Sequence, residues 1–358
     1  MKISILLPYK ENFSPSYPGA VSIFINDTLK VSQFKNNTIV YGNTDYKKKF
    51  NIKYVNLNFK KSLIKSSTKT YIFEFLKREN KNKSNIIEIH NRPSYLKYLN
   101  HISYAKKVLY FHNDPLDMSG SRNINDRLYL IKNLDKIVFN SEWSKSRFIT
   151  DLQPTYAYSN KLHIIKQSID SKNINLKNKK KIIIFIGKLN KAKGYDIFGN
   201  AVIPILKKYK DWSAIVIGDE PREKILFNHH RLKILGFQKH ENVLKYLEKS
   251  SIAIVCSRWN EPFGRTSLEA ASRGCGVIIS NRGGLKETIT DGIVLKNISP
   301  KNFSNSIIKL INDPKLLLKY QKNSLKNFYL TNKYVADKID KYRNEFLFDE
   351  NITLKIQN

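Results

Sequence analysis

The stretch Glu261-Pro-Phe-Gly-Arg-Thr-Ser-Leu-Glu269 sets two carboxylates, with seven residues between them, across a loop that leads into a helix. It follows the apolar run Ile252-Ala-Ile-Val-Cys256, which is short enough to form a buried strand. Gly264 permits a tight turn before the helix-compatible residues Thr266 to Arg273. Because strand, turn and helix follow one another, the stretch predicts one unit of a parallel α/β sheet.

The start of this helix is a natural place for a phosphate group, because it offers backbone N–H groups and the positive end of a helix dipole. Glu261 is expected at the mouth of the loop and Glu269 on the second turn of the helix, so both could face one polyhydroxylated ligand. This arrangement favours a sugar nucleotide. The same spacing also fits an ordinary loop carboxylate and a solvated helix residue, and spacing alone does not decide between the two.

The composition predicts a globular protein with more than one core. At 358 residues the chain is long for a single core, so two domains are expected. Hydrophobic residues make up 41% of the chain and aromatic residues 12%, which excludes a disordered chain. Cys256 and Cys275 lie in apolar sequence, which favours core thiols in a reducing compartment over a disulfide or a metal pair.

The formal net charge of +33 draws the protein towards polyanions, among them nucleic acid, anionic lipid headgroups and phosphorylated glycolipids. Charge alone does not choose among them, and part of it fits a compositional bias towards lysine. The N-terminal apolar run is too short for a signal peptide and stops at Pro8, and no other run approaches the length of a membrane span. We expect a cytoplasmic protein whose membrane contact, if any, is peripheral and on the inner face of the cytoplasmic membrane.

Short apolar runs alternate with helical segments along the first part of the chain. Lys2 to Leu7 predicts a buried strand, and the next loop carries Gly19 into a helix start at Ala20. This opening is Rossmann-like, although a single glycine is a weak phosphate signal. Further strands are expected at 38–41, 86–89, 107–111 and 136–139.

The polar stretch from Ser168 to Lys181 is interpreted as a linker. The run from Ile182 to Ile186 is the strongest strand signal in the chain, so a second doubly wound α/β domain is expected to begin there. Further strands are expected at 214–217, 232–237, 252–256 and 276–279, and helices at 302–311, 314–328 and 335–348.

Two strand ends in the first half carry histidines, His90 and His112, where open α/β sheets bind their ligands. A histidine that only bonds its own loop remains the alternative for each. Lys188 and Lys193 follow the Ile182–Ile186 strand, where they could meet the charge of a diphosphate. In a chain with 63 Lys and Arg residues a solvated lysine is the default, so only position singles these two out.

These residues also carry a family likeness. The block from Ser257 to Ala270, with Gly283-Gly-Leu-Lys-Glu287 after it, resembles the E-x7-E signature of retaining GT-B glycosyltransferases of family 4, the glycosyl transferases group 1. The segment from Phe185 to Gly194 is similar to that family's phosphate-binding segment. The segment from Asp135 to Trp143 resembles its strand near the end of the first domain, and the likeness runs from Lys2 to about Phe348.

The resemblance implies an α/β GT-B fold, in which two Rossmann-like doubly wound domains face each other across a cleft. It places an acceptor-binding domain at residues 1–172 and a nucleotide-sugar-binding domain at residues 173–326. Residues 327–358 would form a helical segment that crosses back to the first domain.

The resemblance also assigns roles. Glu261 would bind the donor sugar, Glu269 the ribose, and Lys188 and Lys193 the diphosphate, while His112 would approach the sugar. Lys188 stands where many relatives have arginine, Gln167-Ser-Ile-Asp170 replaces the usual Asn-Gly-Ile-Asp, and the N-terminal loop has one glycine where relatives often have two. The expected catalytic residues are Glu261, His112 and Lys193; the donor-binding residues are Gly187, Lys188, Lys193, Phe263, Gly264, Arg265, Thr266 and Glu269; the acceptor-side residues are Gly19, His90, Asn113 and Asp114.

We therefore expect a metal-independent, retaining transfer of a hexose-type sugar from a UDP- or GDP-linked donor to a cell-envelope glycan or glycolipid, such as lipopolysaccharide core. The nucleotide-diphosphate sugar is a co-substrate, and no cofactor is expected. One rival is another GT-B enzyme such as a nucleotide-sugar epimerase. The other is a nucleic-acid-binding protein, suggested by the charge of +33 but disfavoured because the chain lacks a recognition motif.

Overall fold

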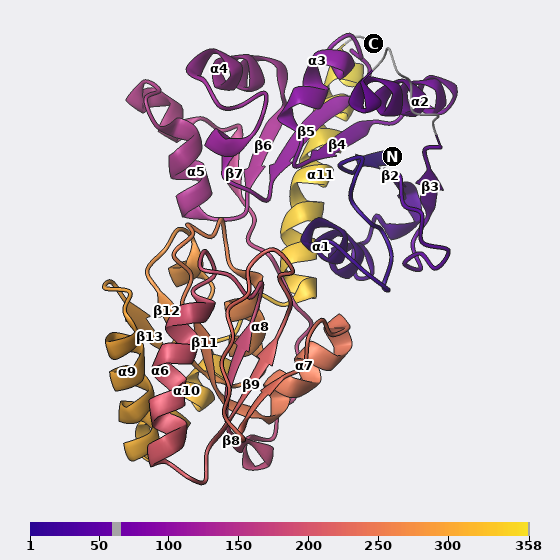
Figure 1. The fold of residues 1–358 in the computed structure, drawn as a ribbon. Coiled ribbons are helices and arrows are strands. Elements are labelled where there is room, and N and C mark those ends of the chain that lie inside the picture. The colour runs from indigo at the N-terminus through magenta and orange to yellow at the C-terminus, as the bar shows by residue number, and fades with distance from the viewer. Residues whose placement is uncertain (59–65, 357–358) are drawn as a thin grey trace. The chain divides into compact units, whose positions relative to one another are not determined.

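The computed structural model describes residues 1–58 and 66–356, and it consists of two compact units (Figure 1). Unit 1 is made of Met1–Ser168 and Leu330–Asn358, and unit 2 is Ile169–Tyr329. The chain thus passes between the units at 168/169 and at 329/330, where the sequence predicted 172/173 and 326/327.

Unit 1 is built on a seven-stranded parallel sheet with the order β3-β2-β1-β4-β5-β6-β7. The order reverses at β1, where Ile3 lies opposite Thr38 of β2 on one side and Ile86 of β4 on the other. The strands are β1 (Ile3–Leu6), β2 (Thr38–Gly42), β3 (Tyr54–Asn56), β4 (Ile86–His90), β5 (Lys106–Phe111), β6 (Lys136–Phe139) and β7 (Leu162–Ile164).

Three helices of unit 1 begin at polar caps. Ser66, Asn123 and Ser141 each accept a hydrogen bond from a backbone N–H in the first turn of the helix that follows, which satisfies a group that has no partner within the helix. The last helix of the chain, α11, packs against α1 and so belongs to this unit (Figure 1). The helices are α1 (Ala20–Leu29), α2 (Ser67–Lys81), α3 (Leu96–Leu99), α4 (Ile124–Asn133), α5 (Glu142–Ile149) and α11 (Asn332–Ile356).

Unit 2 has a six-stranded parallel sheet with the order β10-β9-β8-β11-β12-β13, which is the Rossmann order with a reversal between β8 and β11. Its strands are β8 (Lys180–Ile186), β9 (Ser213–Ile217), β10 (Leu232–Ile234), β11 (Ser250–Val255), β12 (Gly276–Ser280) and β13 (Ile293–Leu295). Its helices are α6 (Tyr195–Lys208), α7 (His240–Lys249), α8 (Arg265–Ser272), α9 (Pro300–Asn312) and α10 (Pro314–Lys326).

The two faces of the unit 2 sheet bury separate cores, because successive side chains of a strand point to opposite faces. Ile183 and Phe185 of β8 join a core with α6 and α9, whereas Ile184 joins a core with α7 and α8. Cys256 and Cys275 are buried free thiols, as the sequence predicted, and burial raises the pKa of Cys256 to about 12.

The prediction of two doubly wound, Rossmann-like α/β domains is confirmed. The linker was expected to run to Lys181, but its last two residues already belong to β8, which begins at Lys180. Among the described residues, no helix combines the length and the hydropathy that crossing a bilayer requires.

Candidate active site

The reversal of strand order in unit 2 places two loops side by side at the carboxyl ends of β8 and β11. Open α/β sheets bind ligands at such a switch point, because the connections on its two sides run to opposite faces of the sheet. Residues 187–194 follow β8 and residues 256–264 follow β11, so all the predicted donor-binding residues except Thr266 and Glu269 lie in these two loops or at the first residue of α8.

The β8 loop is fixed against the β11 loop by backbone contacts. Arg258 donates its backbone N–H to the carbonyl of Ala192 over 2.9 Å, and its guanidinium forms two hydrogen bonds of 2.6 and 2.7 Å with the Asp196 carboxylate. Gly194, at φ +73°, lies so close that an added Cβ would collide with the Cys256 carbonyl oxygen. These contacts hold Lys193 at a defined distance from the second loop.

Lys193 and Glu261, both predicted as catalytic, meet in the structure. The Lys193 Nζ lies 2.5 Å from Glu261 Oε1. The Lys193 side chain is 33% exposed and that of Glu261 13%, so both can still reach a ligand. The Glu261 carbonyl accepts a 2.7 Å hydrogen bond from the N–H of Gly284, which anchors the loop from behind.

Glu269 is a buried, paired carboxylate and not a solvated helix residue. Only 4% exposed, it accepts 2.8 Å hydrogen bonds at Oε1 from Arg265 Nε and, when that nitrogen carries the proton, from His240 Nε2. Burial raises the pKa of Glu269, but the bond with His240 and the Arg265 charge outweigh it and hold the pKa below 4.5. The group is therefore an ionised acceptor near neutral pH.

The other predicted donor-binding residues lie around the start of α8 and the end of β8. Gly264 precedes α8 at φ +109°, a conformation that favours glycine, and Thr266 is half-buried on its first turn. The Phe263 side chain is 1% exposed, so only its backbone can meet a ligand. Gly187 directly follows β8, and the Lys188 side chain next to it is exposed.

Sequence reasoning missed the partners that hold these groups. His240 opens α7, and Arg258 lies within the quoted block but was not assigned a role. The Arg258 pair with Asp196 spans 62 residues of sequence, and the His240 pair with Glu269 spans 29. No local pattern links such positions, because the sheet brings them together.

In unit 1 the two predicted histidines also meet. His90 ends β4, His112 follows β5, and His90 Nδ1 lies 3.0 Å from His112 Nε2. Both rings are buried, at 1% and 7% exposed, and the His90 ring stacks on Tyr110 with centroids 4.4 Å apart. Burial lowers the pKa of both histidines, so both imidazoles are neutral at ordinary pH.

The remaining acceptor-side residues have different surroundings. The N–H of Asn113 donates to Asn91 Oδ1 over 3.1 Å, and its side chain is exposed. Asp114 is buried, caps a 3-10 turn by accepting from the Leu116 N–H, and pairs with Arg147 at 3.0 Å. Asp114 thus has a structural role that the sequence did not indicate.

Gly19 precedes α1, and a carboxylate of the protein itself packs against it. The Glu11 carboxylate lies where a Cβ on Gly19 would be, and it accepts a 2.9 Å hydrogen bond from the Ser22 N–H. Burial raises the pKa of Glu11. The helix start that a phosphate would use is therefore partly occupied by the protein's own acid.

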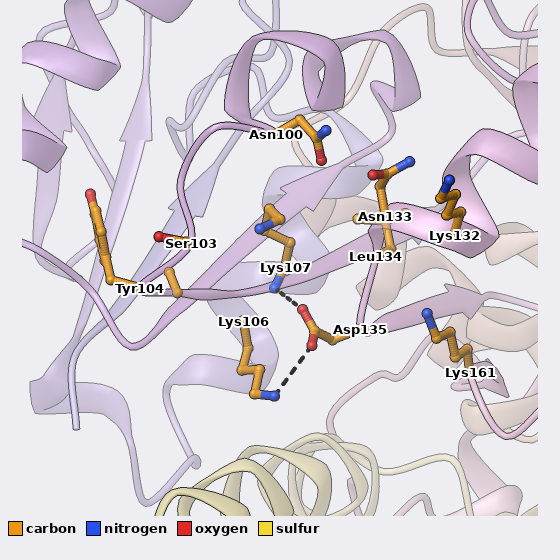
Figure 2. Close-up of a pocket in the computed structure, with 11 residues that line it drawn as sticks. Asn100, Ser103, Tyr104, Lys106, Lys107, Lys132, Asn133, Leu134, Asp135 and Lys161 are labelled. Atoms are coloured by element: carbon orange, nitrogen blue, oxygen red, sulfur yellow. Dashed lines mark hydrogen bonds and ion pairs between the residues drawn. The ribbon is translucent and has the colours of Figure 1, made fainter.

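A lysine-lined cavity of about 430 Å³ lies at the amino-terminal ends of β5 and β6 in unit 1, around Asp135 (Figure 2). Lys106 pairs with Asp135 at 3.4 Å, Lys107 Nζ donates to the Ile102 carbonyl and Lys161 Nζ to the Ile131 carbonyl. The protein itself thus engages these three ammonium groups. The lining residues are Asn100, Ser103, Tyr104, Ala105, Lys106, Lys107, Lys132, Asn133, Leu134, Asp135 and Lys161, and no predicted site residue is among them.

Residues 1–58 and 66–356 contain no cluster of three or more His, Cys, Asp or Glu side chains arranged to hold a metal ion.

The architecture is that of GT-B glycosyltransferases. HepE from Anabaena, solved with UDP-glucose, superposes with a TM-score of 0.75 over 98% of this chain and 100% of its own, at 16% identity. WaaG, a glycosyltransferase involved in lipopolysaccharide biosynthesis, superposes with a TM-score of 0.64 over 95% and 99% at 12% identity. At such identities the likeness shows the fold alone.

The sequence of this chain is also similar to sequences of glycosyltransferases. The family model of glycosyl transferases group 1 matches residues 166–327, a range that covers nearly all of unit 2, Ile169–Tyr329. A putative glycosyltransferase of Bacillus subtilis, YtcC, is 28% identical over 165 residues, covering 41% of this chain and 40% of that protein. The lipopolysaccharide core biosynthesis mannosyltransferase LpsB of Rhizobium meliloti is 29% identical over 131 residues, covering 34% and 37%. The matched regions thus span about two fifths of the length of these curated relatives.

Proposed function

We propose that the protein is a retaining glycosyltransferase that binds a nucleotide-diphosphate sugar in unit 2 and transfers its hexose to a hydroxyl of a glycan or glycolipid. The pair of Lys193 and Glu261 at the strand switch point carries the proposal. It offers a cation for phosphate oxygens beside a carboxylate for sugar hydroxyls. The buried, ionised Glu269 supplies a second acceptor, suited to the two hydroxyls of a ribose.

The proposed reaction exchanges one bond at the anomeric carbon for another. The bond from that carbon to the diphosphate breaks, a bond to the acceptor oxygen forms on the same face, and the acceptor proton passes to the leaving diphosphate. Lys188, Lys193 and the start of α8 would stabilise the charge that develops on the diphosphate. Because these groups already supply positive charge, we propose that no protein-bound metal is needed.

The pair also has to open when the donor binds. In the structure Lys193 neutralises Glu261, and a diphosphate would take over the ammonium while sugar hydroxyls take over the carboxylate. An exchange of partners costs little, because an ion pair that is one-third exposed on one side contributes about 0–1 kcal/mol. We therefore expect the loss of either side chain to affect catalysis much more than folding.

A donor screen tests this proposal. The unfolding temperature, measured with UDP-, GDP- and ADP-hexoses, should rise with one of these nucleotide classes. The reason is that a ligand at a hundred times its Kd stabilises the folded protein by about 2.7 kcal/mol. UDP-glucose is the first candidate, since HepE was solved with it. Lys193→Ala and Glu261→Gln should lose transfer and keep their unfolding temperature.

Lys181→Ala is the matched control, because Lys181 pairs with Asp211 at the opposite end of β8. It should transfer normally. Near-normal turnover in both site variants, or an equal loss of transfer in the control, would contradict the assignment of Lys193 and Glu261 to the donor site. Incubation of donor alone, with product analysis, separates transfer from epimerisation.

For the acceptor we propose a cell-envelope glycolipid, on a cytoplasmic protein that touches the inner membrane face peripherally. The charge of +33 and the likeness to LpsB support this choice. Sedimentation with anionic and with neutral liposomes tests it: binding should be confined to the anionic liposomes and should fall as salt rises, because a screening length of about 10 Å at 0.1 M shortens to about 3 Å at 1 M. Equal behaviour with both liposomes contradicts the proposal.

A further inference from the structure

A buried chain of polar groups in unit 1 runs from the last helix to the predicted catalytic histidine. Arg343 of α11 contacts Glu88 of β4, Glu88 faces His90, and His90 contacts His112. All four side chains are at most 7% exposed. The reaction proposed above assigns no role to Arg343, Glu88 or His90, so their burial beside His112 needs an explanation.

The first link fixes a negative charge. Arg343 Nε and Nη2 each donate to a Glu88 oxygen over 2.8 Å, in the two-bond geometry that suits a guanidinium and a carboxylate. Burial alone would raise the pKa of Glu88, but the Arg343 charge overrides it and lowers the pKa to about 2. Arg343 is held from its other side by Asp340, which lies 3.1 Å from Nη1 and also accepts from Ser32.

The second link selects the tautomer of His90. Its Nε2 lies 3.9 Å from Glu88 Oε2, too far for a hydrogen bond but close enough for the carboxylate to favour a proton on that nitrogen. A neutral ring carries one proton, so Nδ1 is then a bare acceptor. Stacking on Tyr110 holds the ring in this orientation.

The third link follows from the second. Because His90 Nδ1 is an acceptor, the 3.0 Å contact requires His112 Nε2 to carry the proton and to donate it. The His112 Nδ1 is then a bare lone pair, and within the described part of the chain it has no hydrogen-bond partner although it is buried, as is also true of His90 Nε2, which has only the Glu88 charge near it. An unpartnered buried acceptor costs about 1–3 kcal/mol, and such groups persist where a ligand supplies the missing donor.

We propose that Arg343, Glu88 and His90 are positioning residues that hold His112 as its Nε2–H tautomer, so that its Nδ1 accepts a hydrogen bond from a hydroxyl of the sugar substrate. The inference rests on the proposed function for the identity of the ligand, but the tautomer is a property of the protein alone. His112 is thereby an acceptor towards its ligand and not a proton donor. A carboxylate that orients an imidazole in this way is a recurrent device of catalytic sites.

Nuclear magnetic resonance of ¹⁵N-histidine-labelled protein reads the tautomer directly. Among the 7 histidines, His90 and His112 are assigned by single His→Gln variants, and both should carry their proton on Nε2 at neutral pH. Glu88→Gln alone leaves Arg343 buried without its main counter-charge, and removal of Arg343 would leave the buried Asp340 unpaired, so the triple variant Glu88→Gln/Arg343→Met/Asp340→Asn is used. It removes all three charges and offers His90 an amide donor, so the His90 tautomer should mix or invert.

Kinetics then test the consequence. His90→Phe removes the acceptor for His112 Nε2, and kcat should fall about 10- to 100-fold, by analogy with the loss of a group that orients a metal-binding histidine. His90→Asn keeps an oxygen near the Nδ1 position and should recover much of that loss. Tyr110→Phe is the matched control: it keeps the ring stacked on His90 and loses only a hydroxyl that has no partner among the described residues, so it should retain wild-type kcat.

The outcomes separate the two proposals. If no donor yields transfer, the proposed function fails, while the resonance experiment still decides the tautomer. A His112 that carries its proton on Nδ1, or a His90→Phe variant with wild-type tautomer and kcat, overturns the inference. Nucleotide affinity should stay unchanged in the His90 variants, because the nucleotide is assigned to unit 2.

Discussion

Glu269 shows at the scale of one residue how a buried charge depends on its surroundings. Two donors hold it ionised, and its pKa is lower in the folded protein than the ordinary 4.5. A carboxyl with a lowered folded pKa stabilises the protein above its unfolded pKa, and this contribution is lost as the pH falls through the folded pKa.

We predict that Glu269→Gln lowers the unfolding free energy of unit 2 by about 2–4 kcal/mol at pH 7, because Arg265 loses the charge of its buried partner. Wild type should become less stable as the pH falls below 4.5, because Glu269 then takes up a proton. The variant has no carboxyl at this position, so its stability should fall less over the same pH range. Urea unfolding at several pH values measures both effects. Asp211→Asn, which removes an exposed carboxylate, should change little; an equal effect there would show that burial is not the cause.

The sequence indicated single site residues better than it indicated their partners. The E-x7-E spacing and the strand ends singled out Glu261, Glu269 and Lys193 without structural information. The pairing of Lys193 with Glu261 could not be predicted, since 68 residues separate them and the contact arises from the order of strands in the sheet. The pairing of Arg343 with Glu88 could not be predicted for the same reason, because 255 residues separate them.

The loop between β8 and α6 is the element that places Lys193. Gly194 ends it in a left-handed conformation, with the Cys256 carbonyl where a side chain would be. Gly236, between β10 and α7, has a similar φ of +64° but no atom within 4 Å of an added Cβ. The two glycines therefore separate the cost of conformation from the cost of a close approach.

We predict that Gly236→Ala destabilises the protein by about 1 kcal/mol, the cost of the left-handed conformation less the gain from a stiffer unfolded chain. Gly194→Ala should cost about 2–4 kcal/mol, because the backbone must also move. Gly194→Ala should weaken donor binding as well, since Lys193 moves with the loop. Equal destabilisation of the two variants by chemical unfolding would contradict the close approach.

Buried central strands were predictable, whereas the edge strands β3, β7 and β13 were not; the edge strand β10 was expected, at 232–237. The expected strands at 86–89 and 136–139 correspond to β4 and β6, because buried central strands form continuous apolar runs. The edge strands β3, β7 and β13 have three residues each and partly exposed side chains, so they carry no apolar run to detect. Their pairing is decided by the neighbouring strand and not by their own sequence.

At the scale of the whole molecule, the cores of the two units consist of different residues. Because the nucleotide is assigned to unit 2, a bound donor should stabilise that unit more than unit 1. Of the 3 tryptophans, Trp143 lies in unit 1, and Trp212 and Trp259 lie in unit 2. Fluorescence of a Trp143→Phe variant therefore reports unit 2.

We predict that a saturating nucleotide sugar raises the fluorescence-detected unfolding transition of Trp143→Phe, by about 2.7 kcal/mol at a hundred times its Kd. A transition of unit 1, followed through the His90 and His112 resonances, should shift much less. Equal shifts in both transitions would show that the two units unfold as one.

Unit 1 is made from two stretches of chain, and all of unit 2 lies between them. During translation, the ribosome therefore completes residues 169–329 before it delivers Arg343. Until then Glu88 has no counter-charge, and it must stay hydrated or take up a proton, since burying an unpaired carboxylate is costly. Nascent unit 2 can acquire its native structure on the ribosome, whereas unit 1 has to wait until Arg343 has been synthesised, and is the part that would need protection by chaperones.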